Sequence, residues 1–235
     1  MFDRLPAAGF LACGVLLLCS ACAVPPRPAG QPAAGETGPG ITGRLVAAFR
    51  VVESDLAVRV YRDGPLAQLG HNHVVSSTGV TGAVELRDPL EASTFRLSLP
   101  LDSLVVDDPV RRAAAGPDFP DELTDTDREG TRRNLLGPAL FDAVRFPVLH
   151  VDSVGIQTDG HGYAADVRVD AAGIERVIRM PVTIEWDGGD LVASGTLALT
   201  HAEIGLVPYS AALGALRVRD EMEVAYRLVA RRVDP

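Results

Sequence analysis

The chain has 235 residues, of which 47% are hydrophobic and 23% are charged, and its formal net charge is −9 at pH 7. All 22 basic residues are arginine, which excludes catalysis through a lysine Schiff base or a lysine nucleophile. An acidic chain has little electrostatic attraction for nucleic acid, so we expect no nucleic-acid partner. The length allows one large β domain.

Residues 1–22 have the features of a secretory signal peptide. The apolar run from Phe10 to Leu18 is too short to span a bilayer as a mature helix. Ser20 and Ala21 directly before Cys22 resemble the bacterial lipobox, in which the cysteine is lipidated and becomes the mature N-terminus. We therefore expect lipidation of Cys22 and a periplasmic protein anchored to a membrane. An ordinary cleaved signal with a soluble periplasmic product is the alternative.

Residues 23–43 are rich in Pro, Ala and Gly and poor in large apolar side chains. Such a segment cannot bury enough surface to offset the entropy of ordering it, so we predict a flexible tether. The globular domain is then expected over residues 44–235. All three cysteines precede it, at Cys13, Cys19 and Cys22, so no disulfide can stabilise the domain.

Apolar and polar residues alternate along about eight short segments between Asp55 and Tyr226, as in the strands of a half-buried antiparallel sheet. Each strand then has one apolar and one polar face. The positions assigned to the apolar faces are Leu56, Val58, Val60, Val80, Val84, Leu86, Phe95, Leu97, Leu99, Leu149, Val167, Val169, Ile178, Met180, Val182, Ile184, Leu197, Leu199, Met222, Val224 and Tyr226. Arg and Glu on the polar faces are typical of solvation and cross-strand pairing.

A sheet with one long apolar face must cover it, and closing the sheet on itself also removes exposed edges. We therefore predict an all-β fold, a single antiparallel lipocalin-like β-barrel of about eight strands with an apolar lumen. Such a barrel either fills with side chains or holds one elongated apolar ligand. For the second case the candidate ligand-binding residues in the lumen are Val58, Val60, Val84, Leu97, Leu99, Leu149, Val167, Ile184, Leu199 and Tyr226.

Short turn sequences mark where the strands should reverse. They occur at Asp63-Gly64, from Asp159 to Gly162 and from Asp187 to Asp190. These positions predict an up-and-down strand order.

The alternation stops between Asp107 and Phe146. A charged stretch there runs into Leu135, Leu136, Leu140 and Phe141, which have roughly helical spacing. We predict a partly helical flap over one barrel mouth, with Leu136 and Phe141 in contact with the ligand. A plug whose apolar residues simply close the core is the alternative.

The segment from Asn134 to Val154 resembles the most recognisable stretch of the YceI-like family. It contains Phe141-Asp142, a basic step at Arg145, the aromatic–proline pair Phe146-Pro147 and then a strand. Further similarities follow in the same order at residues 171–182, at Glu203-Ile204-Gly205 and from Asp220 to Leu228. The resemblance extends from Asp55 to Val229.

This resemblance implies an extended lipocalin-like barrel, periplasmic in bacteria, that encloses a polyisoprenoid chain such as a quinone or a polyprenyl lipid. No other cofactor is implied. Two features depart from the family pattern. The segment from Arg111 to Arg128 is longer than usual, and Gly70-His71-Asn72-His73 replaces a turn that typically contains His-Leu-Gly.

His71 and His73 are candidate ligand-binding residues, because residues two apart in an extended segment point to the same side. Three roles stay open: a metal site, which would need a third ligand; a contact with a lipid headgroup; and a structural turn in which the imidazoles bond loop carbonyls. His201 has the lumen parity of its strand and could reach a barrel mouth. His150 should face solvent, and His161 lies at a hairpin tip. We expect no stoichiometric metal.

Other polar residues offer weaker signals. No Ser-His-Asp or Cys-His set can be assembled. Asp107-Asp108 and the pair Asp125 and Asp127 could act as paired carboxylates, but exposed acidic loops are the commoner explanation. Arg132, with Arg133 next to it, could clamp a phosphate at the barrel mouth, or both could be solvated charges of the flap.

Two functions are consistent with these residues. The first is a tethered periplasmic lipid-binding protein that sequesters or carries an apolar, isoprenoid chain without chemistry; its partners are that lipid and the membrane. The alternative is a metal-dependent or other catalytic barrel that uses His71, His73 and His201. The sequence carries no signal for an oligomeric state.

Overall fold

The computed structural model describes residues 42–120, 123–160 and 162–233. The expected signal peptide, its Cys22 and most of the expected tether lie outside these ranges, as does His161. Within them, no helix is long and apolar enough to cross a bilayer.

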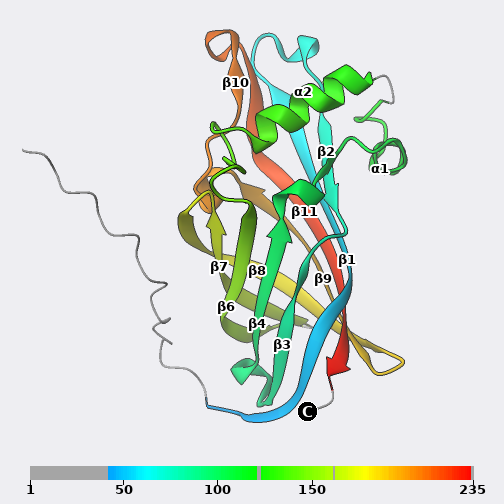
Figure 1. Cartoon of the computed structure of the whole chain (residues 1–235), viewed down its shortest axis with the longest axis vertical. Coiled ribbons are helices and arrows are strands. Elements are labelled where there is room, and N and C mark those ends of the chain that lie inside the picture. Colours follow the sequence, from blue (N-terminus) through cyan, green and yellow to red (C-terminus); the bar gives the residue numbers. More distant parts are fainter. Residues whose placement is uncertain (1–41, 121–122, 161, 234–235) are drawn as a thin grey trace, which may run out of the picture. The chain divides into compact units, whose positions relative to one another are not determined.

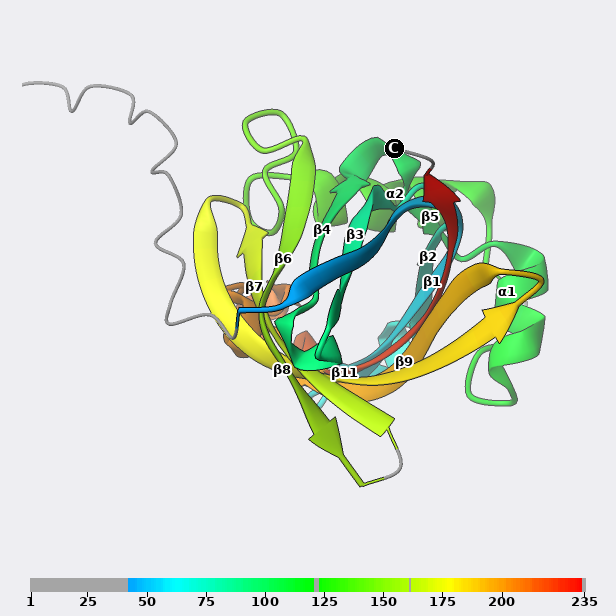
Figure 2. The ribbon, with the colours of Figure 1, turned by 90° about the horizontal axis from the view of Figure 1, so that it is seen from below.

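Eight antiparallel strands form a closed barrel, as the alternation predicts (Figure 2). They are β1 (Arg44–Asp63), β3 (Thr81–Asp88), β4 (Thr94–Pro100), β6 (Val148–Asp159), β7 (Gly162–Ala171), β8 (Ile174–Asp187), β9 (Asp190–Thr200) and β11 (Leu216–Val233). Each strand pairs with the next one in this order, and β11 pairs with β1 from Ala48↔Val233 to Asp63↔Arg217. This last pairing closes the barrel and leaves the meander without a free edge.

Three shorter strands extend the sheet at one end (Figure 1). β2 (His73–Ser77) pairs with the second half of β1, and β3 pairs with its first half, so the two act as one interrupted strand. β5 (Val105–Val106) adds to β2, and β10 (Ser210–Ala211) adds to β11. Short 3-10 turns connect the strands: η1 (Ala67–Leu69), η2 (Leu90–Ala92), η3 (Leu101–Ser103), η4 (Ala202–Ile204) and η5 (Ala212–Gly214).

The predicted turns reverse the chain as expected. Asp187 pairs with Asp190 around Gly188 and Gly189, both of which have positive φ, as a two-residue hairpin turn requires. Asp159 also pairs with Gly162.

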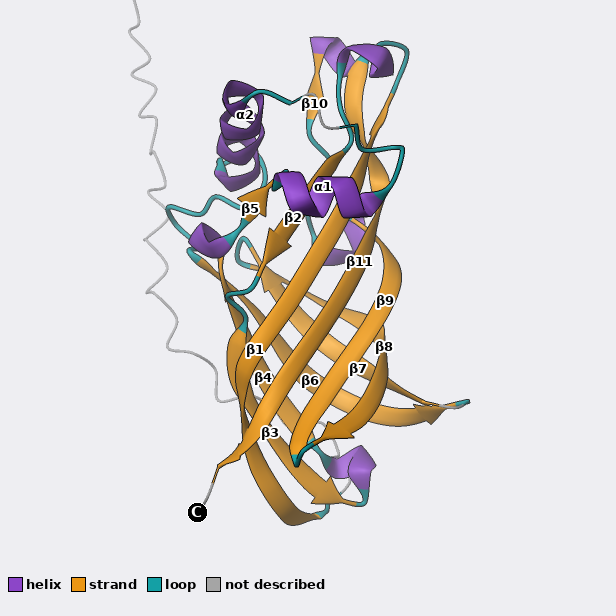
Figure 3. Cartoon of the chain, turned by 90° about the vertical axis from the view of Figure 1, so that its right-hand side faces the viewer, coloured by secondary structure: helices purple, strands orange, loops and turns teal. Residues whose placement is uncertain are grey.

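The irregular region forms a partly helical flap, as predicted (Figure 3). Its helices are α1 (Pro109–Ala115) and α2 (Asp125–Leu136). Asp108 caps α1 by accepting from the backbone N–H groups of residues 110 and 111. Thr124 and Asp127 form a capping box at the start of α2. The pair Asp125 and Asp127 therefore lies in the first turn of a helix.

The inward and outward faces follow the sequence parity. Outward-facing charges pair between neighbouring strands, as in Arg179 with Asp166 and Arg59 with Glu223. The apolar faces gather inside the barrel, where the largest cluster joins β7, β9, η4 and β11.

Candidate functional site

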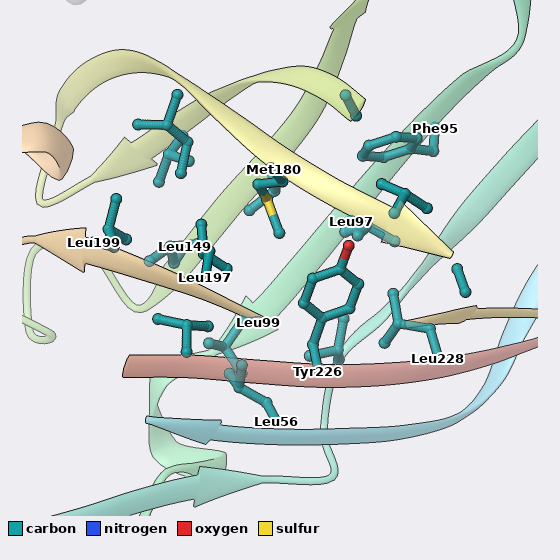
Figure 4. Close-up of a pocket in the computed structure, with 18 of the residues that line it drawn as sticks. Leu56, Phe95, Leu97, Leu99, Leu149, Met180, Leu197, Leu199, Tyr226 and Leu228 are labelled. Atoms are coloured by element: carbon teal, nitrogen blue, oxygen red, sulfur yellow. The ribbon is translucent and has the colours of Figure 1, made fainter. Parts of the chain in front are cut away.

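The barrel encloses an elongated apolar cavity with a volume of about 310 Å³. Every strand of the closed barrel contributes lining residues, among them Leu56, Phe95, Leu97, Met180 and Leu228 (Figure 4). Along β1 the lining runs from Val51 to Val60, which corresponds to about 30 Å of extended strand. The cavity is therefore long and narrow, and its wall is almost entirely hydrocarbon.

Most of the predicted lumen residues line this cavity. They are Val58, Val60, Val84, Leu97, Leu99, Phe141, Leu149, Ile184, Leu199 and Tyr226. Two expectations are corrected. Val167 has the inward parity, but its side chain is completely buried in the cluster formed by β7, β9 and β11 and does not reach the cavity. Leu136 packs against a different cluster at the rim, and its neighbours Leu135 and Leu140 line the cavity instead.

Tyr226 places a hydroxyl group inside the lumen (Figure 4). Its hydroxyl donates a hydrogen bond of 2.6 Å to the carbonyl oxygen of Pro181. Gly195 makes room for this contact, because a Cβ there would lie 2.3 Å from the Pro181 oxygen and 2.7 Å from the tyrosine hydroxyl. Burial raises the pKa of Tyr226 to about 12, so its hydroxyl is neutral at neutral pH.

A second chamber of about 160 Å³, with more polar lining than the lumen, lies at the end of the barrel under the flap. We call it the mouth chamber. Its polar lining residues are Arg62, His71, His73, Thr131, Asn134, His201, Tyr209 and Arg217, and no Asp or Glu is among the described residues that line it. Val60, Val75, Leu135, Leu140 and His201 line both spaces, so the mouth chamber adjoins the apolar cavity.

His73 belongs to a buried charged network that sequence reasoning did not find. Its Nδ1 lies 2.6 Å from Asp107 Oδ2, and Asp107 Oδ1 lies 2.6 Å from Arg112 Nη1. Asp107 and Arg112 are almost completely buried, which overturns the expectation that Asp107 lies in an exposed acidic loop. Burial alone would raise the pKa of Asp107, but hydrogen bonds from His73, the Val74 backbone and Arg112 outweigh it and hold that pKa below its usual value.

The other histidines occupy distinct places. His71 is exposed, with its ring centroid 6.4 Å from that of His73. His201 lines both spaces and is buried, and its Nδ1 lies 2.7 Å from the carbonyl oxygen of Asp220, which can accept a hydrogen bond from it. His150 is exposed on the outer face, as predicted, beside Ser98. Among the residues with described positions, no three His, Cys, Asp or Glu side chains are grouped as metal ligands.

Arg132 lines neither space, although a phosphate clamp at the barrel mouth is one of the two roles that the sequence leaves open for it. Its Nη2 donates to the carbonyl oxygen of Asp102 at 3.0 Å, and its Nε donates to that of Leu104 at 3.3 Å. Both carbonyls belong to the segment between β4 and β5. Arg132 therefore ties α2 to the rim of the barrel.

Comparisons with known proteins agree with this architecture. BcnA of Burkholderia cenocepacia is 14% identical, with a TM-score of 0.54 over 75% of this chain and 95% of that chain. A polyisoprenoid binding domain from Saccharophagus degradans, implicated in plant cell wall breakdown, is 13% identical, with a TM-score of 0.50 over 81% of this chain and 100% of that one. A search of curated proteins gave no significant match. The family model for the YceI-like domain matches residues 66–230, so the chain belongs to the YceI-like domain family.

Proposed function

We propose that this protein binds one polyisoprenoid-type chain in the barrel lumen and holds it without transforming it chemically. The observation that carries the proposal is the long cavity lined almost entirely by apolar side chains. A linear hydrocarbon chain matches this shape along its whole length, and each Å² of apolar surface that it removes from water contributes about 25 cal/mol. A compact polar ligand would leave most of the wall unused.

The comparison with the domain from Saccharophagus degradans supports the ligand class, because that domain is described as polyisoprenoid binding. The position of Tyr226 supports it as well. Its hydroxyl is satisfied by Pro181, so Tyr226 does not present an unpaired polar group that would disfavour a hydrocarbon.

The mouth chamber suits the polar end of such a lipid. Arg62, Arg217 and the three histidines can donate hydrogen bonds, and the surrounding lining offers no carboxylate to repel an oxygen-rich headgroup. We propose that the headgroup lies there, with acceptor oxygens such as those of a quinone. His71 and His73 are then headgroup contacts, and His201 separates the headgroup from the chain.

The proposal extends to the location of the protein. The sequence before residue 23 supports export and lipidation of Cys22, which would keep the barrel at a membrane of the periplasm. The test is fractionation of cells that express the chain with or without Cys22→Ser. We expect the unmodified protein in the membrane fraction and the variant released or left unprocessed; an unmodified protein found only in the soluble periplasm contradicts the anchor.

Native mass spectrometry of the purified protein tests the binding function. We expect an adduct that organic extraction removes and that is identified as an isoprenoid lipid. The stripped protein should take the lipid up again at a ratio of one to one. A protein that carries no lipid and takes up neither isoprenoids nor an apolar fluorescent probe would contradict the proposal.

A further inference from the structure

We propose that two uncharged loops beside the mouth chamber dock the barrel on a lipid bilayer, with the mouth chamber facing the membrane. The first loop comprises residues 64–72 and includes η1, and the second comprises residues 205–216 and includes β10 and η5. We call them the docking loops. They lie together at the end of the barrel opposite the start of β1 (Figure 1). The choice of a bilayer as the partner of this surface rests on the proposed function, in which the ligand is a lipid.

The docking loops expose large apolar side chains that have no place in the core. Leu69 and Val207 are each 73% exposed, and Leu213 is fully exposed. Leu66 and Tyr209 are also exposed. Single exposed apolar residues are normal on a protein surface, but a group of them in one place is typical of an interaction site.

The two loops form one surface. The backbone N–H of Leu66 donates to the carbonyl oxygen of Ala215 at 2.9 Å, and Gly70 lies against the side chain of Leu216. The apolar side chains of both loops are therefore presented by neighbouring segments that are bonded to each other.

Neither docking loop contains an Asp, Glu, Lys or Arg residue, although 23% of the whole chain is charged. The second loop reads Gly-Leu-Val-Pro-Tyr-Ser-Ala-Ala-Leu-Gly-Ala-Leu from residue 205 to residue 216. A loop that only connects two strands in water has no need to exclude charge over this length. Loops whose tips enter the hydrocarbon layer of a bilayer do, because a charged side chain is costly there.

Leu213 adds a conformational argument. Its φ of 55° and ψ of 34° place it in the left-handed region, which glycine and asparagine adopt far more readily than leucine. A turn that served only the local fold would favour one of those residues. Leucine in this place puts a large apolar side chain at the tip of the loop, where the rest of the barrel does not cover it.

Arginines flank the docking loops. Arg62 precedes the first loop, and Arg217 and Arg219 follow the second; Arg217 is paired with Asp63, and Arg219 lies over the ring of Tyr61. Long arginine side chains can reach the phosphates of a lipid headgroup layer while apolar residues enter below them. Because the acidic first turn of α2 lies on the neighbouring flap, we expect apolar insertion to supply most of the affinity.

The mouth chamber lies between this surface and the lumen. Gly70 and His71 from the first loop and Tyr209 and Leu216 from the second line the chamber, and the chamber shares five of its lining residues with the apolar cavity. With the docking loops in the membrane, the route for a lipid from the bilayer into the barrel would run through this chamber, with little of the chain exposed to water. A protein partner would have no need of a chamber that adjoins an apolar lumen beside its contact surface.

Vesicle flotation tests the proposal. The full chain is used with Cys22→Ser, so that no acyl group anchors it, and any contribution of the N-terminal segment is common to all variants. The test variant carries Leu69→Ser, Val207→Ser and Leu213→Ser. The control carries Val110→Ser and Val144→Ser, which are 77% and 94% exposed but lie outside the docking loops.

We expect the parent protein and the control to float with vesicles of phosphatidylcholine and phosphatidylglycerol, and the test variant to lose about tenfold in partition coefficient. Equal flotation of parent and test variant, or an equal loss in the control, would overturn the proposal. So would concentration-dependent dimerisation of the parent that the test variant lacks, without any vesicle binding, because the surface would then serve a second copy of the chain.

Lipid uptake separates this proposal from the proposed function. The test variant should take up an isoprenoid probe dispersed in detergent as the parent does, but should extract it from vesicles about tenfold more slowly. Flotation that depends on the docking loops in a protein that takes up no isoprenoid supports docking and contradicts only the lipid-binding function. Unchanged extraction from vesicles by the test variant counts against docking.

Discussion

Asp107 and Arg112 form an ion pair whose side chains are 0% and 1% exposed, with 2.6 Å between Oδ1 and Nη1. The pair joins the end of β5 to α1. Arg112 also donates to the carbonyl oxygens of Asn72 and Pro120, and Asp107 accepts from His73 and the Val74 backbone. One buried pair thus links β2, the mouth chamber and the flap.

Asp107→Asn should destabilise the protein by about 3–5 kcal/mol, because it leaves the Arg112 guanidinium buried without its counter-ion. Urea unfolding followed by circular dichroism measures the change. Asp125→Asn is the control, since Asp125 is highly exposed in its pair with Arg128 and should matter little. A small effect of Asp107→Asn would show that the network does not hold the flap.

The same network predicts a dependence of stability on acid. The pKa of Asp107 in the folded protein lies below the ordinary value of 3.8. Its contribution to stability is therefore complete above pH 3.8 and is lost as the pH falls through the lowered pKa. The free energy of unfolding of the Asp107→Asn variant should not show this loss. Unfolding curves of both proteins between pH 5 and pH 2 would reveal the difference.

Ile178→Trp should weaken isoprenoid binding by about tenfold or more, because Ile178 lines the cavity and the larger ring occupies space that the chain needs. Its neighbour provides a matched control. Val177 faces outward and is 59% exposed, so Val177→Trp should leave binding unchanged. Titration with a fluorescent isoprenoid measures both, and equal affinities would place the ligand outside the lumen.

Tyr226→Phe should make the protein more resistant to alkali. The pKa of Tyr226 is about 12 in the folded state and 10.0 as a free side chain, so its ionisation in the unfolded state removes stability as the pH rises from 10 towards 12. The shift corresponds to about 2–3 kcal/mol lost over this interval. Unfolding free energies at pH 9 and pH 11.5 should fall less in the variant; parallel losses in both proteins would contradict the assignment.

Arg132→Gln should speed release of bound lipid, because it removes the bonds that hold α2 to the carbonyl oxygens of Asp102 and Leu104. If the free energy of opening the flap falls by about 1–2 kcal/mol, the release rate should rise about tenfold. Stopped-flow transfer to acceptor vesicles measures this rate. Arg133→Gln, at an exposed position on the same helix, should release lipid at the parent rate.

His71→Ala and His73→Ala should differ in their effects. His71 is exposed, so its loss should weaken lipid retention with little change in stability. His73→Ala removes a partner of buried Asp107 and should also cost about 1–3 kcal/mol in the free energy of unfolding. Thermal unfolding with and without lipid separates the two effects; equal destabilisation by both variants would make His71 structural as well.

The barrel and the wall of its cavity could be predicted from sequence because they depend on parity alone. In β8, Ile178 and Ile184 face inward and Arg179 and Glu185 do not, and a period of two makes this assignment independent of any partner strand. Val167 shows the limit of the argument. Parity assigns a side chain to a face, but not to the surface of a cavity within that face.

The network around Asp107 could not be predicted, because charged residues in an irregular segment are exposed in most proteins. Its three members come from β2, the end of β5 and α1, and only the folded chain brings them together. One local signal was available: Asp107 follows the apolar pair Val105-Val106 at a strand end, where the backbone changes direction. The contacts of Arg132 could not be predicted for a related reason, since its carbonyl partners carry no sequence signature.

The seam between β1 and β11 has a consequence for how the chain folds. It pairs Leu56 with Tyr226 and Ala48 with Val233, so the contacts that complete the barrel join residues from opposite ends of the domain. Such contacts raise the contact order. The chain must lose the entropy of closing this long loop before the contacts can stabilise the barrel. We expect slow folding limited by this seam, and β1 should remain an unpaired edge, open to aggregation, until the last strand has been synthesised.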